Sequence, residues 1–246
     1  MQDLGEKFFN INKFPKQEGM LLFAISMSRI SNAQSAEKCF EYMESFIPKI
    51  VKPAVGLNII YADSLYYNSA NEAQELKRKY EPLAHSHKYA FLKLLEKHRQ
   101  YIQPSFSFLS WSQMLLETKE FFSLFGELKK IYASDEFFQK LVREDMKEKS
   151  EFTENDVNFI LEEVLLFYLT SKGGVRLKNE FINDKQKWVL WCYPGKALLS
   201  EIYLYKKNFF GFENPQNIYE NSFYDLTSRK LYDFSKVDLG ELENYL

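Results

Sequence analysis

Cysteine is nearly absent from this chain, which has only Cys39 and Cys192 among 246 residues. Two cysteines in apolar surroundings form no disulfide framework, and their separation matches no zinc-binding spacing. Long hydrophobic runs are also missing, which argues against a membrane-spanning helix, and the first ten residues lack the apolar stretch of a signal peptide. We therefore expect a soluble protein of the reducing cytoplasm that does not bind a membrane.

Glycine-rich phosphate-binding motifs are absent too. Neither GxGxxG nor GxxxxGK[ST] follows an apolar run, which argues against the familiar dinucleotide and P-loop sites. No linker rich in proline, glycine or serine divides the chain, so we expect one domain spanning residues 1–246. The 32 basic and 34 acidic residues almost cancel, so overall charge indicates neither a nucleic-acid binder nor a membrane binder.

Short apolar runs, in contrast, are present and alternate with amphipathic stretches. Such runs suit strands buried on both faces of a parallel sheet, with helices as the crossovers. Strands are expected over residues 20–25, 57–62, 105–109 and 188–193. Helices are expected over residues 36–47, 71–99, 111–126, 128–150, 154–170 and 197–206. The predicted fold class is α/β, a Rossmann-like parallel sheet flanked by helices.

Three of the apolar runs end on polar residues, namely Ser26, Asp63 and Tyr193. In open α/β sheets, ligands bind outside the carboxyl ends of the strands, so we expect these side chains to converge on one crevice. Ser26 alone is weak evidence for a nucleophile, because serines after strands often only begin a turn. No GxSxG motif surrounds it, which argues against a Ser-His-Asp hydrolase.

Glu163 lies on the expected helix over residues 154–170. Its neighbours three and four positions away are all apolar: Phe159, Ile160, Leu166 and Phe167. Burying an unpaired carboxylate costs roughly several kcal/mol, so we expect Glu163 to be protonated, paired or offered to a cation such as a substrate amine. Alternatively, Glu163 extends to solvent or pairs with a lysine. Its neighbour Glu162 is expected to reach solvent at the helix edge.

The expected helix over residues 71–99 is strongly basic at its C-terminal side. Such a stretch can follow an RNA phosphate backbone without reading bases, although a solvated helix face explains it as well. Its basic residues are Lys77, Arg78, Lys79, Lys88, Lys93, Lys97 and Arg99. All three histidines fall in the same stretch, but their spacing supplies no third ligand, so we expect no metal site.

Four segments, read in order, resemble the tRNA-dependent cyclodipeptide synthases. They are LLFAISMSRIS (21–31), LNIIYAD (57–63), FILEEVLLF (159–167) and LWCYP (190–194), with the basic stretch between the second and third. These enzymes join the aminoacyl groups of two charged tRNAs into a 2,5-diketopiperazine. The resemblance implies the fold of the catalytic domain of tyrosyl- and tryptophanyl-tRNA synthetases. Because HIGH and KMSKS-type segments are absent, it implies aminoacyl-tRNA substrates and a monomer that uses neither ATP nor another cofactor.

The resemblance also assigns catalytic roles. By position, Ser26 resembles the nucleophilic serine, Glu163 the glutamate that binds the substrate amine, and Tyr193 the catalytic tyrosine. It implies a ping-pong reaction through an aminoacyl-serine enzyme. Arg29 stands where one branch of the family has asparagine, and Pro194 follows the tyrosine, so the chain resembles the X-Tyr-Pro branch.

A substrate pocket is expected near Ser26. Its predicted lining is Leu22, Ala24, Ile60, Trp111, Phe159, Leu166 and Trp191. Many family members have tyrosine where this chain has Phe159, so no hydroxyl role is expected there. Two tryptophans would leave room only for a small first amino acid, alanine or glycine, unless they pack in the core.

Two other functions stay open from the sequence. A noncatalytic tRNA-binding module would keep the sheet and the basic helix but would not bring Ser26, Glu163 and Tyr193 together. A serine hydrolase or acyltransferase with a small ester substrate would use Ser26 without needing RNA.

Overall fold

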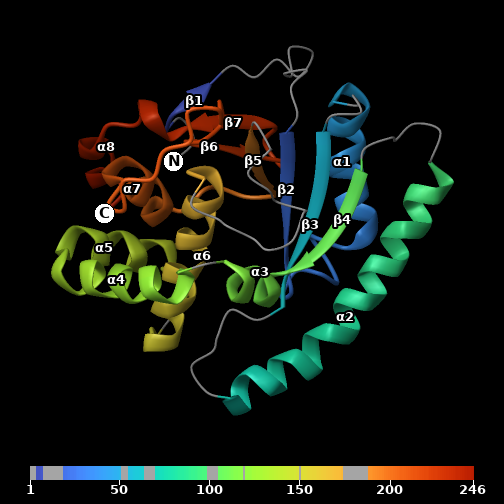
Figure 1. The fold of residues 1–246 in the computed structure, drawn as a ribbon, viewed down its shortest axis with the longest axis horizontal. Helices are drawn as coiled ribbons and strands as arrows, with labels where there is room; N and C mark the ends of the chain where they lie inside the picture. The colour runs from blue at the N-terminus through green and yellow to red at the C-terminus, as the bar shows by residue number, and fades with distance from the viewer. Residues whose placement is uncertain are drawn as a thin grey trace.

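The computed structural model describes residues 4–7, 19–50, 55–63, 70–98, 105–118, 120–149, 151–173 and 188–246. Its centre is a seven-stranded sheet in the order β1-β7-β6-β5-β2-β3-β4, with helices on both faces (Figure 1). The strands are β1 (Glu6–Lys7), β2 (Gly19–Ser26), β3 (Val55–Ala62), β4 (Ser105–Ser110), β5 (Val189–Tyr193), β6 (Ser222–Asp225) and β7 (Lys230–Asp233). The predicted α/β class is confirmed.

The four strands predicted from apolar runs lie side by side as β5-β2-β3-β4. They pair in parallel, and β6 adds a further parallel strand beside β5. At the edge of the sheet, β7 runs antiparallel to β6, and β1 pairs antiparallel with β7, so β1 has the same direction as the parallel strands. Because β2 is central, its C-terminal residue Ser26 lies between the ends of β5 and β3.

Eight α-helices are described, and they lie on both sides of the sheet. They are α1 (Ala36–Ile50), α2 (Ala70–Lys97), α3 (Trp111–Glu117), α4 (Phe121–Ser134), α5 (Glu136–Asp145), α6 (Glu154–Ser171), α7 (Leu199–Lys207) and α8 (Leu239–Glu243), with a 3-10 turn η3 (Phe234–Lys236). Figure 1 shows α2 as a long helix along one side, opposite the group formed by α4, α5 and α6. No helix in the described ranges is long and apolar enough to cross a membrane.

The helices predicted over residues 111–126 and 128–150 are each interrupted in the structure. The first is interrupted before α4, where Glu120 adopts a left-handed backbone conformation with φ of 68°. The second contains Asp135, whose side chain accepts the amide N–H of Phe138 and starts α5. Caps of this kind divide a periodic stretch without disturbing its apolar spacing.

Side chains of β2 alternate between two hydrophobic cores. Leu21, Phe23 and Ile25 pack with α1 and α2, whereas Leu22 and Ala24 pack with α6 and its neighbours. Burial on both faces explains why this strand reads as an unbroken apolar run.

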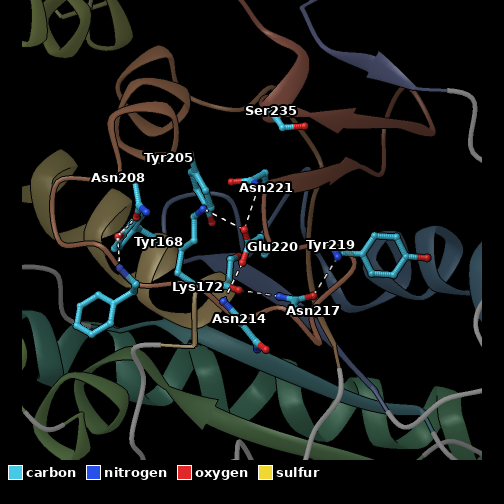
Figure 2. A network of polar contacts seen from close by, with 12 residues as sticks. Tyr168, Lys172, Tyr205, Asn208, Asn214, Asn217, Tyr219, Glu220, Asn221 and Ser235 are labelled. Atoms are coloured by element: carbon cyan, nitrogen blue, oxygen red, sulfur yellow. Dashed lines mark hydrogen bonds and ion pairs between the residues drawn. The ribbon is translucent and has the colours of Figure 1, made fainter.

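A polar network ties the end of α6 to the segments around β5 (Figure 2). The buried Lys172 donates to Glu220 at 3.2 Å, and Asn217 donates to the Ser171 carbonyl at 2.7 Å. The Asn217 side chain also accepts the amide N–H of Val189, the first residue of β5, at 3.1 Å. This network holds α6, which carries Glu163, against the strand that carries Tyr193.

Candidate active site

A cavity of about 530 Å³ lies at the carboxyl ends of β2 and β5. Ser26 and Tyr193, the last residues of those strands, both line it, and Glu163 lines it from α6. Its volume falls within the range of small-molecule sites, which is roughly 300 to 1,000 Å³. The three residues assigned catalytic roles by resemblance are thus brought to one cavity.

Ser26 is fixed by the segment that follows its strand. The backbone N–H of Ser26 donates to the side-chain oxygen of Gln34 at 2.8 Å, and the Gln34 amide group donates to the Ala24 carbonyl at 2.9 Å. The Ser26 hydroxyl lies 2.9 Å from the Ser28 hydroxyl. The fully buried Gln34 therefore closes the end of β2 and leaves the serine hydroxyl on the cavity wall.

Glu163 lies among aromatic and aliphatic groups on the face of α6 that lines the cavity. Phe159, Ile160 and Phe167 share that face, three or four positions away. Burial, followed by a smaller effect of Asp145, raises the pKa of Glu163 to about 7, and Arg29 opposes the increase. The carboxyl therefore changes charge near neutral pH, as a group that exchanges a proton with an amine requires.

Tyr193 lies beside both of these groups. The Arg29 side chain lies over its ring, with the guanidinium carbon 5.8 Å from the ring centroid. Burial, followed by a smaller effect of Glu163, raises the pKa of Tyr193 to about 12, while Arg29 and a hydrogen bond with Ser26 oppose the increase. The phenol is consequently protonated at neutral pH and lies within reach of the serine.

The described chain has the fold of solved cyclodipeptide synthases. A cyclodipeptide synthase from Bacillus thermoamylovorans is 16% identical, covers 81% of this chain and 86% of its own, and superposes with a TM-score of 0.51. A second, from Staphylococcus haemolyticus, is 11% identical, covers 84% and 89%, and has a TM-score of 0.50. A Mycobacterium tuberculosis structure (15% identity, 81% and 82% coverage, TM-score 0.49) is described as demonstrating that cyclodipeptide synthetases are related to type I tRNA synthetases.

Sequence comparison adds nothing to this likeness of fold. No protein-family model matches the chain, and no curated protein matches it. At such low identity, the likeness to cyclodipeptide synthases establishes the fold alone.

The predicted substrate pocket is only partly the observed cavity. Three of the seven predicted residues line it: Ala24, Trp111 and Phe159. The other four are packed in the core instead: Leu22, Ile60, Leu166 and Trp191. Leu22, Ile60 and Trp191 lie on strands and on the predicted face of the sheet. Each stands two residues before the residue of its strand that lines the cavity, which is Ala24, Ala62 or Tyr193. The alternation of side chains along a strand predicts which face of the sheet a residue lies on, but it does not predict how far along the strand the cavity begins.

The prediction that Glu162 reaches solvent is wrong. Its side chain is 5% exposed and accepts a hydrogen bond from the Trp111 indole at 3.2 Å. Asn158, which suggested a polar helix edge, is buried as well. This side of α6 packs against α3 and α4, a contact that the local spacing does not reveal.

Asp63 does not line the cavity, although it also follows a strand. Its carboxylate accepts hydrogen bonds from the Ser112 backbone N–H at 3.1 Å and from the Ser112 hydroxyl at 2.9 Å. It therefore fixes the start of α3 instead of facing the crevice with Ser26.

Four charged residues with no predicted catalytic role also line the cavity: Arg29, Lys149, Lys196 and Glu201. Arg29 follows Ser26 by three residues, so its proximity could have been expected from the sequence. Glu201 lies in the first turn of α7, and its burial depends on the packing of α7 against α6, for which the sequence carries no local signal.

The basic helix is α2, which lies outside the sheet (Figure 1). Six of its predicted RNA-binding residues are exposed: Lys77, Arg78, Lys79, Lys88, Lys93 and Lys97. Arg99 lies outside the described residues. On the opposite side of α2, the buried His87 contacts the Tyr61 hydroxyl and the Gln34 carbonyl, each at 3.0 Å. In the described ranges, no group of three histidine, cysteine or acidic side chains could hold a metal ion.

Proposed function

We propose that this protein is a tRNA-dependent cyclodipeptide synthase of the X-Tyr-Pro branch. It would act as an aminoacyltransferase that makes a 2,5-diketopiperazine from two aminoacyl-tRNAs through an aminoacyl-Ser26 intermediate. The observation that carries the proposal is the placement of Ser26, Glu163 and Tyr193 on one cavity, in a fold shared with cyclodipeptide synthases.

In the first step, the Ser26 hydroxyl attacks the ester carbonyl of the first aminoacyl-tRNA. A new ester forms on Ser26, the bond to the tRNA breaks, and the serine proton ends on the ribose hydroxyl of the departing tRNA. The tRNA ester is already activated, so the reaction needs no ATP. The protein positions the reacting groups and transfers protons. The neighbouring hydroxyls of Ser28 and Tyr193 support the positioning of the attacking oxygen.

In the second step, the amino group held on Ser26 becomes the nucleophile. Glu163 binds the ammonium as a carboxylate and accepts one proton, which its pKa of about 7 permits. The free amine attacks the ester of the second aminoacyl-tRNA. A peptide bond forms, the second tRNA leaves with a proton from the nitrogen, and a dipeptidyl group remains on Ser26.

In the third step, the amino group of the dipeptidyl group attacks the Ser26 ester. The ring closes through a second amide bond, and the carbon–oxygen bond to the serine breaks. Tyr193, protonated at neutral pH, relays a proton to the Ser26 oxygen as it leaves. Ser26 is thereby free for another cycle.

The tRNA itself would bind to the exposed basic residues of α2. Lysines contribute to such binding by replacing counterions along the phosphate backbone. Lys149 and Lys196 are exposed at the cavity and fit the phosphates near the acceptor end.

The proposal is tested by adding one labelled aminoacyl-tRNA to the purified protein and measuring the intact protein by mass spectrometry. We expect an aminoacyl adduct on the wild type and none on Ser26→Ala, with both proteins equally folded by circular dichroism. Adding a second aminoacyl-tRNA should release a diketopiperazine. An adduct that persists in Ser26→Ala would remove the serine from this role.

The same assay separates the two other functions. A noncatalytic tRNA-binding module would bind tRNA without forming adduct or product, and the convergence of Ser26, Glu163 and Tyr193 argues against it. A hydrolase with a small ester substrate would keep its activity after treatment with ribonuclease, whereas the proposed synthase would lose it.

A further inference from the structure

Glu201 has no role in the steps above, yet it lines the same cavity. It lies in the first turn of α7, and Leu198 and Phe223 line the cavity with it. Its side chain is only 1% exposed. One carboxyl oxygen, Oε2, has no hydrogen-bond partner among the described residues. A buried acceptor without a partner is rare in folded proteins and calls for a ligand or another explanation.

The surroundings of Glu201 are acidic. Glu163 and Asp145 both act to raise the pKa of its carboxyl, after burial itself. The other two carboxyls have partners: Asp145 accepts the N–H groups of Leu199 at 2.7 Å and Ser200 at 2.9 Å, and Glu163 interacts with Arg29. Within the described ranges, a backbone hydrogen bond at Leu198 lowers the pKa of Glu201, and no cation contributes to that pKa.

The cations that line the cavity are already engaged or lie in solvent. Arg29 lies over Tyr193, and Lys149 forms an ion pair with Asp156. Lys196 is exposed. The end of the cavity at α7 therefore combines apolar walls, one carboxyl oxygen without a partner and two neighbouring carboxyls that disfavour its ionisation.

We propose that Glu201 is a specificity-determining residue that selects an aminoacyl group with a cationic side chain, that of lysine, arginine or histidine. This inference rests on the proposed function, in which Glu163 binds the amino group of the aminoacyl substrate, so that another residue has to recognise the side chain of that substrate. A cationic side chain donates to the unfilled oxygen and offsets the repulsion among the three carboxyls. Its hydrocarbon part packs against the apolar wall that includes Phe223.

A site built around one hydrogen bond discriminates against substrates that cannot make it. An apolar side chain of similar length would leave Oε2 of Glu201 buried without a partner, which is strongly disfavoured. Glu201 should therefore act on the choice of amino acid and not on the loading of Ser26 as such.

The test uses the purified full chain with tRNAs charged separately with lysine, arginine, histidine, methionine, leucine and alanine, combined in pairs. We expect the wild type to form its main cyclic product with at least one basic residue. Glu201→Gln should lower formation of that product at least tenfold. It should favour the methionine or leucine product in competition, while adducts of the other, non-basic amino acid still form on Ser26.

Glu162→Gln is the matched control, because Glu162 is also buried but does not line the cavity, and its partner Trp111 can donate to glutamine as well. It should leave the product profile unchanged. Cyclic products that contain only uncharged side chains in the wild type would overturn this inference and leave the proposed function standing. If no pair yields a cyclic product and Ser26 is never loaded, both are overturned.

Discussion

The guanidinium carbon of Arg29 lies 5.8 Å from the ring centroid of Tyr193. The same arginine lowers the pKa of Glu163 and of Tyr193, so it couples the segment after Ser26 to both other catalytic candidates.

Replacing this positive charge should change the pH dependence of peptide-bond formation. In Arg29→Gln, the pKa of Glu163 rises because the opposing cation is gone. The rising limb of the pH–rate profile should then move to higher pH by roughly half a unit or more. Single-turnover transfer from aminoacyl-Ser26 measures this. Arg29→Lys keeps the charge and should stay close to the wild type, and an identical limb in both variants would contradict the coupling.

Glu163 should itself produce that rising limb. Only its carboxylate form can accept a proton, so transfer should increase as pH rises through about 7 in the wild type. Glu163→Gln should transfer at least roughly tenfold more slowly, since charge-assisted hydrogen bonds contribute about 1.5 to 3 kcal/mol. It should also lose the limb near pH 7. Glu162→Gln serves as the control with an unchanged profile.

Tyr193→Phe should separate loading from ring closure. Removing the phenol takes away the proton donor to the departing Ser26 oxygen, and general acid catalysis contributes about a hundredfold or more. We expect a dipeptidyl adduct to accumulate on the variant while the aminoacyl adduct forms at a rate closer to that of the wild type. Intact-protein mass spectrometry over time distinguishes the two species. Equal slowing of both steps would assign Tyr193 to positioning instead.

The basic face of α2 should govern the salt dependence of tRNA use. Replacing Lys77, Arg78 and Lys79 by alanine should weaken binding of aminoacyl-tRNA and reduce the slope of log K against log salt by roughly two, if each residue contacts one phosphate. A matched triple of exposed lysines elsewhere consists of Lys130, Lys140 and Lys236. Alanine at those three positions should leave the slope unchanged. An equal effect of both triples would point to nonspecific charge.

The polar network in Figure 2 should matter for stability more than a surface ion pair does. Lys172→Met leaves the Glu220 carboxylate without its buried partner, and we expect the free energy of unfolding in urea to fall by about 2 to 3 kcal/mol. The control is Lys129→Met, which breaks an exposed pair with Glu154 and should cost less than about 1 kcal/mol. Similar values for both variants would show that Lys172 does not hold the network.

Much of the parallel sheet could be predicted because its strands are buried on both faces and read as unbroken apolar runs. β6 and β7 were missed because each has only four residues, too few for a pattern. Ser26 and Tyr193 were found because strand ends are visible in sequence. The environment of Glu162 and Glu201 was not, because it is created by neighbouring helices far away in the chain.

The buried Gln34 connects the two ends of the proposed substrate path. Its side chain hydrogen-bonds to the Ser26 backbone N–H and to the Ala24 carbonyl, and its own backbone carbonyl oxygen lies 3.0 Å from the His87 imidazole of α2. Three links thus join the helix proposed to receive the tRNA to the backbone of the proposed nucleophile. A tRNA bound to α2 would therefore lie on a helix that is hydrogen-bonded, through Gln34, to the backbone of the serine, so we expect the position of its acceptor end to decide how the ester aligns with Ser26.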